Sequence, residues 1–309
     1  MIKLFNINDH IIDTSKLTGL HDSIVGEFEQ EIANFVGAKY ACGVSSATNA
    51  IFLTLLNKEV DVEVPSIIPP VVCNAILTSG NTVSFRDDID WVGDSYILHD
   101  FGDYKIVDSA QKIEHNQYKQ ECNPQDLMLF SFYPTKPIGS FDGGLIVSDD
   151  KEKIEWLKIL TKNGMEFCHQ SWKRRAIVPG FKMYLNAIQA YIASENYKKL
   201  SEKYQALSWV RHKYNQAFDL NNSSNHLYRV NIEDRAGFLE KAKKEKIEIG
   251  IHYSAVHLNN VYCRENLILP KSEIESLTTI SLPFNECLVD KQIEKVINLV
   301  NEHGHFKNI

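Results

Sequence analysis

Lys136 is the residue whose surroundings most directly suggest chemistry. It lies in FSFYPTKPIGSFDGG, between an apolar segment and the glycine pair Gly143 and Gly144. A lysine buried at such a place loses proton affinity, and its neutral amine can then attack a carbonyl carbon. A solvated loop lysine is the ordinary alternative, so Lys136 needs support from other residues.

Two further segments add to Lys136 through their order in the chain. Asp108 ends the apolar stretch of KIVDSAQ, where an acid can lie at the carboxyl edge of a sheet and face a ligand. The small residues of SSATNA (45–50) can let backbone N–H groups approach an anion at a helix N-terminus. A strand-end turn acid and a plain Ser/Thr helix cap are the simpler explanations. Asp108 precedes Lys136 by 28 residues. Gln111 follows Asp108 by one helical turn, and Ser131 lies five residues before Lys136.

A basic stretch offers a place for phosphate groups. Lys173, Arg174 and Arg175 are followed by Lys182. Such a cluster can hold the phosphates of a nucleotide through charge-assisted hydrogen bonds. A solvated surface run explains it equally well.

The bulk composition excludes several classes of protein. The 309 residues carry a net charge of −7, which gives nucleic-acid binding no electrostatic support. The N-terminus has no signal-peptide pattern, and no apolar run approaches the roughly 20 residues of a membrane helix. The six cysteines are scattered singly, which is typical of reduced thiols. We therefore expect a cytoplasmic protein that binds neither nucleic acid nor membrane.

The elements that position these residues alternate between strand and helix. Residues 24–35 have helical apolar spacing and end at Gly37, and the strand candidates are 40–44, 62–68, 83–85, 96–101, 105–107, 127–132 and 145–149. This alternation predicts an α/β fold with a mostly parallel sheet. About three residues join 96–101 to 105–107, too few for a parallel crossover, so these two form an antiparallel pair or one is not a strand. The turn that ends in Gly143 and Gly144 predicts a hairpin.

The second half of the chain predicts a separate, smaller unit. A long helical pattern covers 185–218, and beyond it come a strand (HLYRVNI), a helix (AGFLEKAKKEK), a strand (IEIGIHY) and a final helix (DKQIEKVINLVNE). We expect a large domain over 1–200 and a small α/β C-terminal domain over 201–309, with the long helix linking them.

Taken together, these segments resemble the DegT/DnrJ/EryC1/StrS family of nucleotide-sugar aminotransferases, which use pyridoxal 5'-phosphate (PLP) on a fold-type I, aspartate aminotransferase-like scaffold. FSFYPTKPIGSFDGGLIVSDD resembles the family's Ser-Phe-x-x-x-Lys segment with its glycine pair, and IVDSAQ resembles its Asp-x-Ala-Gln/His motif. EFEQEIANFVGAKYACGVSSATNAIFLTLL resembles the opening helix and its Ser-Gly-Thr turn, and IEIGIHYSAVHLNNVY resembles part of the C-terminal domain.

The resemblance implies a role for each matching residue. Lys136 would form the Schiff base and act as general acid and base, and Asp108 would pair with the pyridinium nitrogen. Gln111 would contact the phenolic oxygen or brace the ring. The remaining cofactor contacts are expected from Ala47 and Thr48 to the phosphate, and from Ser131. Family members are homodimers with shared active sites, so a homodimer is expected here.

Substrate contacts follow from the same resemblance. The family commonly supplies an asparagine from the partner subunit near the cofactor phosphate, and the matching position here is Tyr184, with Lys182 nearby. His252 and Tyr253 lie in a strand that the family uses near the active site, as does His257. We list Lys182, Tyr184, His252 and Tyr253 as candidate substrate residues, and satisfied hydrogen-bonding residues of the small domain are the alternative for the last two. No metal site is expected.

The chain also departs from the family pattern. The aromatic ring that often covers the cofactor after the second strand is replaced by SIIPPVV, with Pro69 near the expected position, which suggests an aliphatic cover. The region between Asp87 and Asp108 lacks the usual strand–helix crossover, and the chain is short at its N-terminus. The leading hypothesis is amino transfer, with L-glutamate as donor, to a nucleotide-linked keto-sugar for polysaccharide or related glycan synthesis. The alternatives are a non-catalytic or regulatory descendant, a PLP-dependent sugar dehydratase, in which a histidine replaces the lysine, and an aminotransferase for a smaller keto compound.

Overall fold

The computed structural model describes residues 1–7, 12, 13, 15, 17, 18, 22–167, 173–263 and 266–304. Its largest sheet has the strand order β1–β7–β6–β5–β4, formed by β1 (Tyr40–Val44), β7 (Gly144–Ser148), β6 (Leu127–Ser131), β5 (Lys105–Asp108) and β4 (Tyr96–Asp100). Three two-stranded sheets accompany it: β2 (Asp61–Pro65) with β3 (Thr82–Arg86), β8 (Met165–Phe167) with β9 (Arg174–Ala176), and β10 (Tyr228–Asn231) with β11 (Thr279–Leu282).

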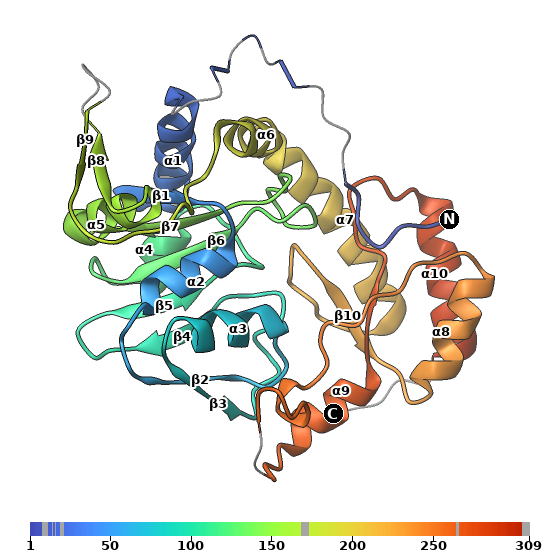
Figure 1. Ribbon diagram of the computed structural model, residues 1–309. Coiled ribbons are helices and arrows are strands. Elements are labelled where there is room, and N and C mark those ends of the chain that lie inside the picture. Colours follow the sequence, from blue (N-terminus) through green and yellow to red (C-terminus); the bar gives the residue numbers. More distant parts are fainter. Residues whose placement is uncertain are drawn as a thin grey trace.

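The helices cover this framework on both faces (Figure 1). They are α1 (Ser23–Val36), α2 (Ala47–Leu55), α3 (Pro70–Thr78), α4 (Gln117–Glu121), α5 (Lys151–Thr161), α6 (Ala187–Tyr197), α7 (Leu200–Phe218), α8 (Arg235–Lys244), α9 (Pro270–Thr278) and α10 (Asp290–His303), with a 3₁₀ turn at Val256–Leu258. The expected long helix over 185–218 is two helices, α6 and α7, which are interrupted at Lys198 and Lys199.

The α/β architecture is confirmed, but the large sheet is mixed. Among its described strands only β5 and β6 pair in parallel, and the other neighbours are antiparallel. The reason is the length of the connections, since β4 and β5 are joined by residues 101–104 and β6 and β7 by a loop without a crossover helix. Of the two alternatives for 96–101 and 105–107, the antiparallel pair is the one observed, and the predicted hairpin that ends at the glycine pair is confirmed.

Alternating side chains of the large sheet pack into two cores. Ile106, Leu127, Leu129 and Ile146 face one core, which includes buried residues of α2, α3 and α5. Their neighbours Val107, Met128, Phe130, Leu145 and Val147 face the other, which includes buried residues of α1 and α6. This period of two is the strand periodicity that the sequence shows, and burial on both faces holds the sheet rigid beneath the site.

A third core lies in the C-terminal part of the chain and includes residues of α7, α8, β10, β11 and α10. The N-terminal Ile2 packs into it, and the N-terminus lies beside these helices in Figure 1. The predicted strand IEIGIHY is wrong as a continuous strand. Ile247 bridges to Ile2 and Gly250 to Ser281, two different partners in turn, so no continuous ladder forms. The division at residue 200 stays a prediction.

Candidate active site

A cavity of about 490 Å³ lies against the carboxyl edge of the large sheet. The strands β1, β5 and β6 run in one direction and end at this edge, because β7 is antiparallel to both β1 and β6, and β5 is parallel to β6. Ligands of open α/β sheets bind at such an edge. Its lining includes the predicted residues Ala47, Thr48, Asp108, Gln111, Ser131, Lys136, His252 and Tyr253.

Lys136 lies in the loop that follows β6 and is partly buried. Desolvation lowers the pKa of its amine to about 8, while the negative charge of Asp108 acts in the opposite direction. The Nζ atom of Lys136 lies 3.3 Å from Nε2 of the buried His226. The amine is therefore far more often neutral near pH 7 than an ordinary lysine, which suits attack on a carbonyl carbon.

Asp108 is buried at the end of β5, and both of its carboxylate oxygens accept a hydrogen bond. The backbone N–H of Ala110 donates to Oδ1 over 2.9 Å, and the hydroxyl of Tyr96 donates to Oδ2 over 2.9 Å. Desolvation raises the pKa of Asp108, and the bonds from Ala110 and Tyr96 and the charge of Lys136 partly offset this. The carboxylate thus has a defined orientation beside the cavity.

Gln111 connects the two sides of the cavity. Its Oε1 accepts the backbone N–H of Gly93 over 2.8 Å, and its Nε2 donates to the hydroxyl of Tyr253 over 3.1 Å. The ring of Tyr253 stacks on Trp91, with centroids 6.5 Å apart and planes 8° apart. Hydrogen bonds within the protein therefore fix both ends of the Gln111 amide group without a ligand.

The N-terminus of α2 provides an anion cradle. The Ser46 side chain caps the helix by accepting a hydrogen bond from the N–H of Asn49 over 3.2 Å. The Ser/Thr helix cap, the simpler explanation of the segment 45–50, is therefore present. Ala47 and Thr48 form the first turn, whose N–H groups have no acceptor within a helix. The close approach of β7 depends on Gly144, where a Cβ atom would lie 2.7 Å from the nitrogen of Ala47.

Several cavity residues were missed from the sequence, among them Trp91, His226 and Phe5. Trp91 lies in the short segment before β4 and donates from Nε1 to the carbonyl of Ile67 over 3.0 Å. It adds an aromatic ring to a lining that also includes Pro69, and the aliphatic cover over the cofactor stays a prediction. His226 and Phe5 also line the cavity, with rings stacked 5.7 Å apart. Only the unusual tryptophan within the polar stretch DDIDWVGD was a usable signal.

Other candidate residues lie elsewhere. Lys182 and Tyr184 do not line this chain's own cavity. Lys182 forms an isolated antiparallel backbone bridge with Lys162, and Tyr184 forms one with Val44. Of the basic stretch, Arg175 forms an ion pair with Glu166 on the β8–β9 hairpin, which projects from the large-sheet side in Figure 1.

His257 is buried away from the cavity. Its Nδ1 lies 2.6 Å from the Ser66 hydroxyl, and its Nε2 lies 3.5 Å from Glu273. This arrangement joins the end of β2 to the 3₁₀ turn, and Ser66, His257 and Glu273 are not among the residues that line the cavity. In the described residues no group of three or more acidic, histidine or cysteine side chains is arranged to hold a metal ion.

The fold and the site define a class of α/β protein with a partly buried lysine, an acid and a helix N-terminus around one cavity. Comparison with known proteins places the chain within it. The model of the DegT/DnrJ/EryC1/StrS aminotransferase family matches residues 11–96 and 88–301. The chain belongs to this family.

Its relatives carry names that match the family. The chain is 25% identical to the spore coat polysaccharide biosynthesis protein SpsC of Bacillus subtilis, over 90% of this chain and 89% of that protein. It is 27% identical to the UDP-4-amino-4,6-dideoxy-N-acetyl-beta-L-altrosamine transaminase of Campylobacter jejuni, over 73% and 74%. The solved structure of NtdA from Bacillus subtilis with bound cofactor PMP shares the fold, with a TM-score of 0.77, 18% identity and coverage of 90% of this chain and 76% of that chain.

None of the helices in the described part of the chain combines the length and apolar character needed to cross a bilayer.

Proposed function

We propose that this chain binds PLP on Lys136 and transfers an amino group from an amino acid, with L-glutamate the expected donor, to a keto-sugar carried by a nucleotide. The observation that carries the proposal is the meeting of Lys136, Asp108 and the first turn of α2 around one cavity. These residues come from three separate chain segments, and each suits a different part of the cofactor.

The residues fit PLP at each end of the molecule. The first turn of α2, with the Thr48 hydroxyl, offers hydrogen-bond donors for the phosphate. The Asp108 carboxylate can accept a hydrogen bond from the protonated ring nitrogen. When bound, PLP supplies an electron-withdrawing ring that stabilises negative charge at the carbon next to the transferred nitrogen. Lys136 would hold the cofactor, and its amine would act as the general acid and base that moves the proton at that carbon.

The acceptor is proposed from the names of the relatives and from the basic stretch. The Campylobacter jejuni relative is named as a transaminase of a UDP-linked sugar, and the Bacillus subtilis relative as a polysaccharide biosynthesis protein. The family resemblance implies a homodimer, in which Lys182 and Tyr184, outside the lining of this chain's cavity, would approach the partner's site. Free cysteines in the described chain, such as Cys42 and Cys73, agree with a cytoplasmic reaction.

A spectroscopic experiment tests the proposal. Protein mixed with PLP should develop a Schiff-base absorption band, and Lys136→Ala should abolish it. Lys151→Ala is the matched control, since Lys151 is an exposed lysine on α5 paired with Glu155. An unchanged band in Lys136→Ala would contradict the proposal. Transfer of labelled nitrogen from glutamate to a panel of nucleotide-linked keto-sugars then tests donor and acceptor, and a catalytically inert protein would show no transfer.

A further inference from the structure

The reversed direction of β4 brings new residues to the active-site edge. β4 runs antiparallel to β5, so its first residue, Tyr96, pairs with the last residue of β5, Asp108. The connection is only residues 101–104, closed by a bond from the N–H of Phe101 to the carbonyl of Tyr104 over 2.9 Å. A parallel β4 would have placed Tyr96 at the opposite edge of the sheet. The short connection is thus what brings Tyr96 to the cavity edge.

The contact between Tyr96 and Asp108 is buried and directional. Tyr96 is 6% exposed and Asp108 5% exposed, and the phenol donates to Oδ2 over 2.9 Å. Each carboxylate oxygen has two acceptor sites, so the bonds from Tyr96 and Ala110 leave room for a further donor. A buried carboxylate with donors on both oxygens has little freedom to rotate.

Electrostatics makes Tyr96 a donor rather than a competing anion. Burial and the neighbouring charge of Asp108 raise the pKa of the Tyr96 phenol well above its usual value, so it stays protonated. Its hydrogen bond in turn opposes the effect of burial, which raises the pKa of Asp108. Lys136 and Tyr253 are the other titratable groups that interact with this carboxylate.

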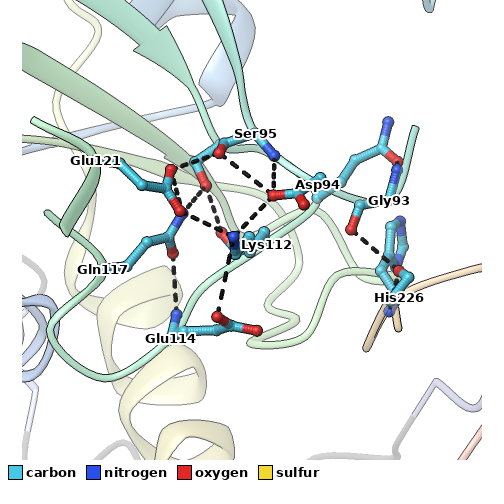
Figure 2. Close-up of polar contacts among 11 residues, drawn as sticks. Gly93, Asp94, Ser95, Lys112, Glu114, Gln117, Glu121 and His226 are labelled. Atoms are coloured by element: carbon cyan, nitrogen blue, oxygen red, sulfur yellow. Dashed lines mark hydrogen bonds and ion pairs between the residues drawn. The ribbon is translucent and has the colours of Figure 1, made fainter. Parts of the chain in front are cut away.

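The segment that carries Tyr96 is itself anchored at several points. The Trp91 ring packs against Tyr96 with centroids 4.6 Å apart, and the Gly93 N–H binds Gln111. Figure 2 shows the next residue, Asp94, held by Lys112, whose Nζ also contacts Glu121. Both Lys112 contacts are 2.8 Å. The segment 91–96 is therefore tied to the chain that directly follows Asp108.

We propose that Tyr96 is a positioning residue: its phenol orients the Asp108 carboxylate toward the ring nitrogen of the bound cofactor, and its hydrogen bond favours the carboxylate over the carboxylic acid. The part of this role that concerns the cofactor rests on the proposed function. Tyr96→Phe removes the hydroxyl and keeps the ring that packs against Trp91. Tyr214→Phe is the matched control, because Tyr214 is buried and its hydroxyl binds only the carbonyl of Pro283 among the described contacts, over 3.0 Å.

The first measurement is made on the protein without cofactor. Aspartate labelled with ¹³C at the carboxyl carbon allows a titration by NMR, and Asp108→Asn assigns the Asp108 signal. The pKa of Asp108 should rise by roughly one unit in Tyr96→Phe, the size expected for one lost hydrogen bond to a charged group, and stay unchanged in Tyr214→Phe. An unchanged Asp108 titration in Tyr96→Phe overturns the proposal, whatever the cofactor does.

The second measurement adds PLP. Tyr96→Phe should bind PLP roughly tenfold more weakly and shift the acidic limb of the bound-cofactor absorbance to higher pH by about one unit, with Tyr214→Phe matching the unchanged protein. Equal PLP affinity and an equal pH limb in Tyr96→Phe would overturn the link from Tyr96 to the cofactor. A wild-type protein that forms no Schiff-base band instead overturns the proposed function, and the NMR titration alone then decides whether Tyr96 positions Asp108.

Discussion

The two sides of the cavity are built in different ways. One side, the strand-end wall, consists of Ala47, Thr48, Asp108, Ser131 and Lys136, which follow the carboxyl ends of parallel-running strands. The other, the aromatic wall, consists of Phe5, His226, His252 and Tyr253, which come from loops far apart in the sequence.

The walls also differ in charge. The strand-end wall holds an acid and an amine that act on each other electrostatically. On the aromatic wall, desolvation lowers the pKa of His226 well below its usual value and that of His252 to about 4, so both are neutral near pH 7. The comparison suggests that proton transfer belongs to the strand-end wall, while the aromatic wall contributes shape and neutral hydrogen-bonding groups.

The largest effect is expected from Asp108→Asn. The amide keeps the shape of the side chain but removes the negative charge, so amino transfer should fall by roughly a hundredfold or more. Single-turnover rates with a nucleotide-linked keto-sugar measure this. Asp142→Asn is the control, since Asp142 also lines the cavity and accepts the N–H of Gly143 over 2.8 Å. Equal losses in both variants would mean that Asp108 has no special role on the strand-end wall.

A second prediction concerns the phosphate cradle on the same wall. In Gly144→Ala the new Cβ would lie 2.7 Å from the nitrogen of Ala47, so backbone must move. We expect a loss of about 1–3 kcal/mol in the free energy of unfolding, together with weaker PLP binding. Denaturant unfolding and PLP titration measure the two effects.

Gly26→Ala is the control, a glycine substitution at a position where a Cβ atom has space. Gly26 lies within α1, with no atom within 4 Å of its added Cβ, so the substitution should stabilise the protein by roughly 0.5–1 kcal/mol and leave PLP binding unchanged. A stable Gly144→Ala with normal PLP affinity would show that the close approach of β7 to α2 does not shape the cradle.

The difference between the walls explains what the sequence could predict. The residues of the strand-end wall stand at or just after the ends of short apolar strands, so local pattern, motif order and the family resemblance together located Asp108, Ser131 and Lys136. The glycine pair predicted the hairpin that positions Lys136. These features depend on residues that are neighbours in the chain, so they can be recognised in the sequence.

The aromatic wall depends on contacts between distant segments. Phe5 stacks on His226, and Trp91 stacks on Tyr253, with no local periodicity to indicate either pair. Residues 247–253 looked like a strand because they alternate, but their backbone partners are Ile2 and Ser281 in turn. The direction of β4 was predictable from its short connection, whereas the contact of Tyr96 with Asp108 required the actual register.

The smallest effect tests whether the aromatic wall influences the amine across the cavity. Nε2 of the neutral His226 lies 3.3 Å from Nζ of Lys136, and in the tautomer whose Nε2 carries no proton it accepts from the Lys136 ammonium, which favours the charged amine. His226→Leu removes this acceptor and keeps an apolar side chain beside Phe5, so the pKa of Lys136 should fall below its value of about 8, by up to roughly one unit. The rate of Schiff-base formation with PLP, measured against pH, would then reach half its maximum at lower pH.

His252→Leu separates a direct contact from a general change of polarity. His252 also lines the cavity, but its Nδ1 lies 2.8 Å from the Ser281 hydroxyl, whereas the imidazole in contact with the Lys136 amine is that of His226. Its substitution should move the midpoint much less than His226→Leu does. If both variants shift the midpoint equally, the aromatic wall acts on Lys136 only by excluding water. If neither shifts it, the two walls are electrostatically independent, and the pKa of Lys136 is lowered by its burial without a contribution from the two histidines.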